Sequence, residues 1–222
     1  MRTISYSKLL LLSAIFSWTQ TGYAQSPPGA FPVGSMYAYP ELEASVRRDS
    51  NINIQPSATA QSDTILNLRL SVRLEAKKDA NLYTFGYRGD YGRYNHETSN
   101  NFENHELFGE ANLPIDMRNF LRLKMQYLDR VDPIGTLNGP ATSTPVPSRW
   151  HQPGIFGFYS YGAEGAMGRI ELEGGYIDKR YTNNQSVTSG LNFDRANYGG
   201  TFLWRVRSKT YLTFNLQQSV NH

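Results

Sequence analysis

The sequence predicts an all-β protein, an antiparallel up-and-down transmembrane β-barrel, from three observations. Nine stretches alternate apolar and polar residues with a period of two, as strands with one apolar and one wet face do. The connections between these stretches alternate short and long, like the periplasmic turns and extracellular loops of bacterial barrels. Tyrosine accounts for 15 of the 222 residues, and its ring suits the two interfaces of a membrane.

Residues 1–24 are predicted to be a cleaved secretory signal. Arg2 and Lys8 supply positive charge, a short apolar run follows from Leu9 to Phe16, and Ala24 ends a small-x-small cleavage pattern. The apolar run is shorter than the roughly 20 residues that a membrane helix needs. A membrane-anchoring helix is therefore the less favoured alternative, also because polar residues follow the run directly.

Composition excludes several function classes. The signal holds two of the 22 basic residues and none of the 19 acidic ones, so its removal lowers the formal charge from +3 to +1. With this balance, and without a basic run that interleaves aromatics, we expect no nucleic-acid partner. The absence of cysteine excludes disulfides, a thiol nucleophile and a zinc-thiolate site.

The chain after the signal starts with a segment rich in Pro, Gly and Ser. Residues 25–40 are expected to form a flexible periplasmic lead-in, and residues 41–222 the barrel. The first strand is predicted at 41–47. The second strand, at 66–75, has the clearest alternation, with one face made of Leu66, Leu68, Leu70, Val72 and Leu74.

The remaining seven strands follow in order along the chain. They are predicted at 82–91, 105–113, 121–127, 155–163, 169–176, 197–206 and 212–217. Phe156 and Phe158 blur the phase of the sixth strand, because they alternate out of step with Ile155 and Tyr159. In the ninth strand, apolar residues alternate with polar ones, which are Leu212, Phe214 and Leu216 against Thr213, Asn215 and Gln217.

The connections support the membrane assignment. The short ones are 77–79, 114–119, 164–168 and 207–209, and the long ones are 48–62, 92–102, 129–154 and 179–192. With a periplasmic N-terminus, every turn and loop falls on its expected side. A soluble β-sandwich is the alternative, but the second, third and fifth strands are longer than the 5–6 residues of an average soluble strand.

Charged residues in mid-strand are the candidate lumen-facing residues. They are Arg69, Arg73, Arg88, Asp90, Arg122, Lys124, Glu171, Glu173 and Arg205. Arg88 and Asp90 are two apart and share a face, so we expect an internal ion pair that fills the barrel; a constriction or a saccharide contact is the functional alternative.

Closure of the sheet raises a further expectation. Lipid offers no hydrogen-bond partners to an open edge, and single-chain bacterial barrels have even strand numbers. Nine strands is an odd count, and the sequence ends where a long loop would begin. The chain is therefore expected to be the N-terminal portion of a larger barrel.

Two Gly- and Tyr-rich stretches carry a family resemblance. Residues 85–94 and 160–172, with the segment 49–52, resemble the outer-membrane β-barrel porin type 2 family, and the resemblance spans roughly Leu42 to Gln218. It implies an outer-membrane barrel, often associated with exopolysaccharide or capsule production and export. The implied partners are outer-membrane lipid, polysaccharide and periplasmic export components, and no catalytic motif comes with the resemblance.

Catalytic, cofactor and metal sites are not predicted. The histidines, His96, His105, His151 and His222, stand at no metal-ligand spacing. We therefore expect a non-enzymatic exopolysaccharide-associated barrel; a general diffusion porin or a structural barrel is the alternative, and an outer-membrane hydrolase is the weakest. The loop 129–154 is expected to be plainly exposed, although it could also fold inward or bind a partner.

Overall fold

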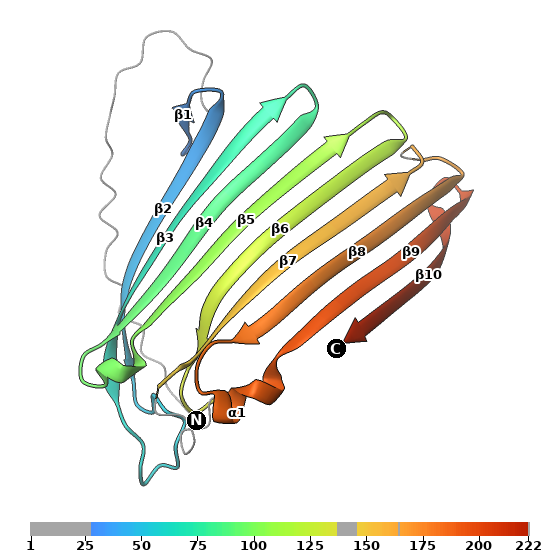
Figure 1. The fold of residues 1–222 in the computed structure, drawn as a ribbon. Helices are drawn as coiled ribbons and strands as arrows, with labels where there is room; N and C mark the ends of the chain where they lie inside the picture. Colours follow the sequence, from blue (N-terminus) through green and yellow to red (C-terminus); the bar gives the residue numbers. More distant parts are fainter. Residues whose placement is uncertain (1–27, 137–145, 164, 222) are drawn as a thin grey trace, which may run out of the picture.

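The computed structural model describes residues 28–136, 146–163 and 165–221, and all of its strands belong to one antiparallel sheet (Figure 1). The strand order along the sheet is the order along the chain, so each strand pairs with the one before and the one after it. This is the up-and-down topology that the sequence predicts. A β-sandwich is excluded for these residues because no second sheet packs on the first.

The elements have the following bounds. The strands are β1 (Phe31–Val33), β2 (Met36–Asp49), β3 (Asp63–Lys78), β4 (Asn81–Tyr94), β5 (Phe102–Pro114), β6 (Asn119–Asp132), β7 (Ser148–Tyr161), β8 (Gly168–Tyr181), β9 (Phe193–Arg207) and β10 (Thr210–Asn221). Three short helical turns lie in the loops, η1 (Thr98–Asn100), α1 (Gln185–Thr188) and η2 (Ser189–Leu191). In the described ranges, no helix is long and apolar enough to cross a membrane.

The nine predicted strands correspond to β2–β10, and β1 is additional. The structure places β1 and the first residues of β2 within the range 25–40, where the sequence suggested a flexible lead-in. The lead-in's periplasmic location stays a prediction. The predicted signal, residues 1–24, lies outside the described residues.

The alternation of short and long connections is confirmed. The short connections are residues 79–80, 115–118, 162–167 and 208–209, and the long ones are residues 50–62, 95–101, 133–147 and 182–192; residues 137–145 and 164 of these connections lie outside the described residues. The loops are shorter than predicted because the strands extend further at this end. The first turn uses Asp79 with a φ of 56°, a left-handed conformation that Asp tolerates better than most residues.

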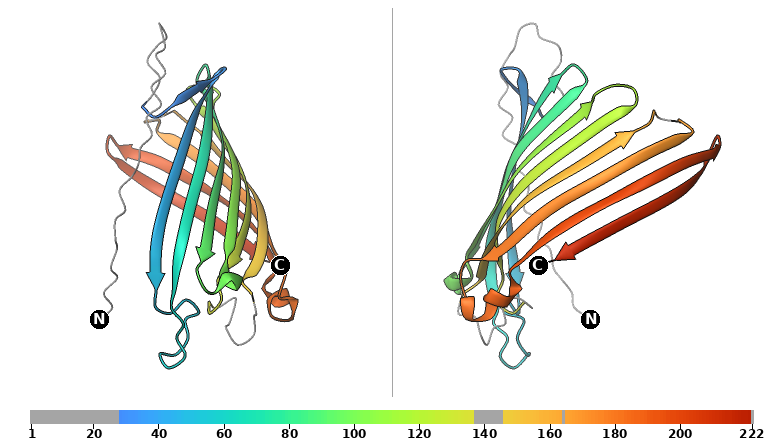
Figure 2. Two further views of the ribbon diagram at one scale, coloured as in Figure 1. Left: turned by 90° about the vertical axis from the view of Figure 1, so that its left-hand side faces the viewer. Right: turned by 45° about the vertical axis from the view of Figure 1, so that its right-hand side comes forward.

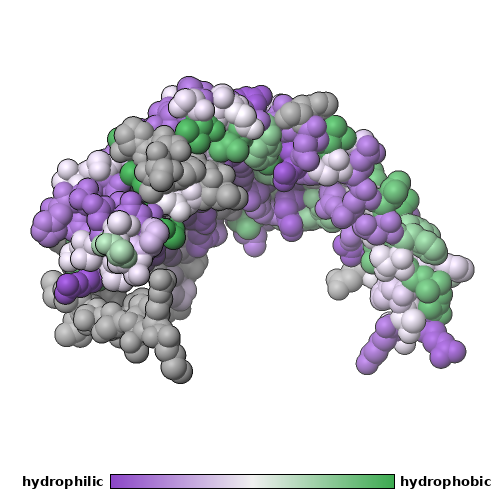
Figure 3. Space-filling view, turned by 90° about the horizontal axis from the view of Figure 1, so that it is seen from below, coloured by the Kyte–Doolittle hydropathy of each residue, from purple (hydrophilic) through white to green (hydrophobic). Residues whose placement is uncertain are grey.

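The sheet curves into an open arch with two chemically different faces. Cross-strand pairs set apolar residues opposite apolar ones and polar residues opposite polar ones, since Leu42 lies opposite Leu70 and Glu43 lies opposite Arg69. Figure 2 shows the curvature from two sides, and Figure 3, seen from the loop end, shows hydrophobic residues along the outside of one limb and hydrophilic residues within the arch. Apolar residues of the convex face are widely exposed, Leu42 by 68% and Leu216 by 80%. This is the distribution of a sheet that has lipid outside and water inside.

The phase of the sixth predicted strand is resolved by its register. In β7, Ile155 pairs with Met125 and Tyr176 on the convex face, whereas Phe156 pairs with Lys124 and Gly175 on the concave face. Phe158 also lies on the concave face, opposite Arg122. Two large aromatic rings therefore lie among the polar residues.

The sheet does not close on itself. In the described residues, β1 and β10 are its two edges, and no pairing joins them. The arch in Figures 1 and 2 is therefore barrel-like in curvature and topology without being a sealed cylinder.

Candidate functional site

All nine candidate lumen-facing residues lie on the concave face. The register places Arg69 opposite Asp90, Arg88 opposite Ser71, and Arg122 opposite Phe158. Arg73, Lys124, Glu171, Glu173 and Arg205 fall on the same side of their strands by the same period of two. Whether this face lines a lumen stays a prediction.

The expected pairing of Arg88 with Asp90 does not form. Asp90 accepts a hydrogen bond from Nε of Arg69 at 3.3 Å, and Arg69 also lies 3.6 Å from Glu43. Arg88 pairs instead with Glu106 of β5 at 3.0 Å. The physical reason is that each side chain has a partner of opposite charge directly opposite it on a neighbouring strand, Arg69 for Asp90 and Glu106 for Arg88.

The ion pairs continue across the loop end of the sheet. Glu106 also accepts a hydrogen bond from Arg130 of β6 at 3.0 Å. Together with Glu43, Arg69 and Asp90, these side chains line a groove of about 350 Å³. We call these alternating charges the ion-pair ladder, and it spans β2–β6. Because acids and bases alternate, the ladder is close to neutral overall.

Aromatic rings with cations beside them form a second feature of the concave face. All eight cation–aromatic contacts of the described residues lie on this face. They are Arg73 with Tyr39, Arg88 with Phe108, Arg122 with Phe120 and Phe158, Lys124 with Phe156, Lys179 with Trp150 and Tyr181, and Arg195 with Phe193. A water-filled channel alone needs polar side chains on its inner face, so these rings call for a further explanation.

Two of these rings are accommodated by glycines on the neighbouring strand. A Cβ atom on Gly86 would lie 2.2 Å from the Phe108 ring, and one on Gly175 would lie 2.5 Å from Phe156. Both rings therefore occupy the space above a bare backbone. The glycines at these positions thus have a local packing role.

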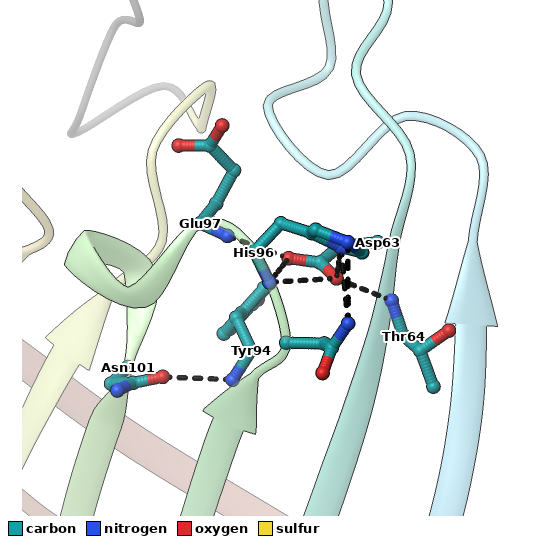
Figure 4. A network of polar contacts seen from close by, with 7 residues as sticks. Asp63, Thr64, Tyr94, His96, Glu97 and Asn101 are labelled. Carbon is teal, nitrogen blue, oxygen red and sulfur yellow. Dashed lines mark hydrogen bonds and ion pairs between the residues drawn. The ribbon is translucent and has the colours of Figure 1, made fainter.

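The loops at the long-loop end are packed together. Asp63, at the start of β3 and beyond the apolar band of that strand, has a side chain with no exposed area. It accepts hydrogen bonds from the backbone N–H groups of Thr64, His96 and Glu97 at 2.7, 3.0 and 2.8 Å, and the His96 ring nitrogen Nδ1 lies 3.1 Å away (Figure 4). Burial alone would raise the pKa of the Asp63 carboxyl, but the donors around it hold that pKa well below its usual range.

A small apolar cluster lies beneath these loops. Ile52 of the β2–β3 loop packs on Ile65 and Tyr94, with Phe102 beside them. Ile65 and Tyr94 pair directly, on the concave side of the sheet. The β2–β3 loop is therefore turned toward the concave face rather than away from it.

The described residues of the β6–β7 loop also pack against the β2–β3 loop. Asn53 accepts a hydrogen bond from Asn100 at 2.9 Å, and a Cβ atom on Gly135 would lie 1.9 Å from the Asn53 carbonyl oxygen. Ile134 is only 8% exposed. The described part of this connection is thus not the plain exposed loop that the sequence suggested; residues 137–145 lie outside the described residues.

The histidines occupy unrelated places. His96 contacts Asp63, His105 lies within hydrogen-bond distance of the Tyr87 hydroxyl at 2.7 Å, and His151 stacks on Tyr127. His222 lies outside the described residues. Across the part of the chain that the structure describes, no group of three or more His, Asp or Glu side chains could hold a metal ion.

Sequence reasoning missed Glu43, Glu106 and Arg130, which complete the ion-pair ladder, and the aromatic rings of the concave face. The signal for the first three was present in the strict parity of their strands. Glu43 lies within the predicted first strand, 41–47, whereas Arg130 falls in the predicted loop 129–154, because the predicted fifth strand ends at residue 127 and β6 continues to Asp132.

The comparisons with known proteins point to one family. A family model with the description "Putative beta-barrel porin 2" matches residues 27–207. No curated protein and no solved structure matches the chain.

Proposed function

The chain belongs to the beta-barrel porin 2 family, and from this premise we propose that it is a non-enzymatic outer-membrane protein that takes part in producing or exporting an exopolysaccharide. The proposal includes export through a cleaved signal at residues 1–24. It also includes contacts with outer-membrane lipid, with polysaccharide and with periplasmic export components.

One observation supports the polysaccharide assignment best. The concave face combines charged side chains with aromatic rings, while the convex face is apolar. The C–H groups of a sugar ring are weakly positive and favour the negative faces of aromatic rings. The charged and amide side chains offer hydrogen bonds to hydroxyl groups. A polymer of sugars can use both.

A general diffusion porin is the second candidate, and the ion-pair ladder favours it. Since Glu106 is shared by Arg88 and Arg130, the charges of the ladder offset one another. A neutral, hydrated wall selects weakly between small solutes, as a general pore requires. This candidate leaves the aromatic rings without a role.

Two measurements test the proposal. Deletion of the gene is expected to lower secreted polysaccharide, with restoration by the intact gene. Planar bilayers with the protein are expected to show ion conductance that added exopolysaccharide blocks. Unchanged secretion after deletion would overturn the polysaccharide role, and conductance insensitive to any polysaccharide would favour the diffusion porin.

A further inference from the structure

A groove of about 590 Å³ crosses the concave face between β6 and β10, away from the ion-pair ladder. Ligand clefts in proteins commonly measure about 300–1,000 Å³, so the groove has the size of a binding site. Phe156 and Phe158 of β7 border it, together with Arg122 and Lys124 of β6. On its other side lie polar residues of β8, β9 and β10.

The Phe156 ring is held in position by the strand beside it. It occupies the space above Gly175, where a Cβ atom would lie 2.5 Å from its Cδ1 atom. One side of the ring therefore rests on the backbone of β8, and the other side borders the groove. A ring fixed in this way is a platform for stacking, because it loses little conformational freedom when a ligand binds.

The charge beside this platform is positive. The Lys124 ammonium lies 5.8 Å from the centre of the Phe156 ring, and Lys124 has no ion pair among the described residues. Arg122 donates a hydrogen bond to Asn112 at 2.8 Å and lies only loosely paired with Glu110, at 3.8 Å. These two cations are available for an anionic group.

The opposite wall offers hydrogen-bonding groups. Glu173 accepts a hydrogen bond from the Gln217 amide at 2.8 Å, and Asn197 and Ser219 lie nearby in the groove. Amide and hydroxyl groups can both donate and accept, which suits the hydroxyl groups of a sugar.

From this arrangement we propose that the groove binds an acidic saccharide, with a sugar ring stacked on Phe156 or Phe158 and a carboxylate held by Lys124 and Arg122. The inference rests on the proposed function and adds to it the chemical class of the polymer. Single-stranded nucleic acid also uses rings and cations. It fits less well, because most sugar oxygens of nucleic acid are esterified, which leaves few free hydroxyl groups for Glu173, Asn197 and Ser219 to bind.

The test is calorimetric titration of the full chain, folded in detergent micelles, with hexagalacturonate, with neutral maltohexaose and with oligothymidylate as the nucleic-acid probe. We expect hexagalacturonate to bind more tightly, with an affinity that falls as salt rises. Lys124→Gln is expected to weaken only the acidic ligand, by about fivefold. Phe156→Leu keeps an apolar side chain over Gly175 but removes the aromatic face, so it is expected to weaken both ligands about fivefold.

Matched controls lie outside the groove. Lys209→Gln, in the exposed β9–β10 turn, removes a positive charge, and Phe214→Leu removes a ring from the convex face, where Phe214 is 58% exposed. Neither is expected to change binding. Circular dichroism of each variant checks that the sheet has formed.

Three results would overturn the inference: no binding of hexagalacturonate by the folded protein, equal binding by Lys124→Gln, or tighter binding of oligothymidylate than of the saccharide. These outcomes are separable from failure of the proposed function. Normal binding with unchanged secretion after gene deletion leaves the site in place and removes the export role. Lost secretion after gene deletion, with no saccharide binding by the folded protein, supports the export role and removes the proposed binding site.

Discussion

At the residue scale, the buried carboxylate of Asp63 connects the start of β3 to the β4–β5 loop. Its oxygens accept hydrogen bonds from backbone N–H groups of His96 and Glu97, which fixes the β4–β5 loop against the start of β3. Because its folded pKa is lowered, the carboxylate stabilises this contact fully above its unfolded pKa of about 4, and the contribution is lost as the pH falls toward the folded pKa. We expect the amide proton signals of Thr64 and Glu97, which donate to this carboxylate, to show an acid step below about pH 4.

Asp63→Asn provides the check on this acid dependence. An amide offers one acceptor oxygen instead of two, so the variant should show displaced signals at neutral pH and no further acid step. Asp116→Asn is the matched control, because Asp116 accepts hydrogen bonds from Arg118 and Asn119 in a turn at the opposite end of the sheet. An acid step that survives in Asp63→Asn would assign the titration to another group.

The two faces of β3 give a second prediction at the same scale. Leu70 belongs to the apolar row of β3 that faces outward, and Arg69 is its polar neighbour on the concave side. In lipid, Leu70→Arg is expected to lower the free energy of unfolding by about 2–4 kcal/mol if Leu70 lies near the midplane. Arg69→Leu loses only exposed ion pairs, each contributing about 0–1 kcal/mol, so its effect is expected to be smaller. Equal losses in urea titrations of folded protein in vesicles would contradict the assignment of the faces.

The contact between the β2–β3 and β6–β7 loops gives a prediction at the element scale. Gly135 has a φ of 84° and lies against the Asn53 carbonyl, so it has neither the conformation nor the space for a side chain. Gly135→Ala is expected to separate the two loops, and limited proteolysis should then cut the β2–β3 loop faster. Gly190→Ala is the control, because a Cβ atom there meets nothing within 4 Å. Equal cleavage in both variants would mean that the loops do not depend on this contact.

Element positions were predictable where one physical cause dominated. The sequence locates the turns to within two residues, because the period of two stops at short polar segments such as residues 77–79. Strand ends at the loops were placed too early, because outward-facing residues such as Glu103 and Asp129 are charged although the hydrogen-bonded ladder continues. The alternation of apolar and polar residues therefore predicts only the part of each strand that carries apolar side chains on its convex face, whereas the full strand extends as far as its backbone pairing.

The site was predictable only in part for a related reason. Parity along a strand identified which charges share a face, and Arg69, Lys124 and Glu173 lie together on it. The partners of these charges depend on the register between strands, which follows from turn geometry rather than from alternation. Phe156 and Phe158 contradicted the simple pattern of polar inside and apolar outside, so only the register could place them.

At the scale of the whole molecule, the open edges decide how the sheet can lie in a membrane. Every second backbone N–H of β10 points away from β9, and in hydrocarbon each unpaired group costs several kcal/mol. We therefore expect that in lipid vesicles these edge groups acquire partners, from further strands or from another chain. Hydrogen exchange followed by mass spectrometry should show β10 as slowly exchanging in vesicles as the central strands β5 and β6. In micelles, where water reaches an open edge, β10 should exchange faster than they do. If β10 exchanges rapidly in vesicles while β5 and β6 stay protected, the edge is hydrated, and the sheet does not cross the bilayer as a closed wall.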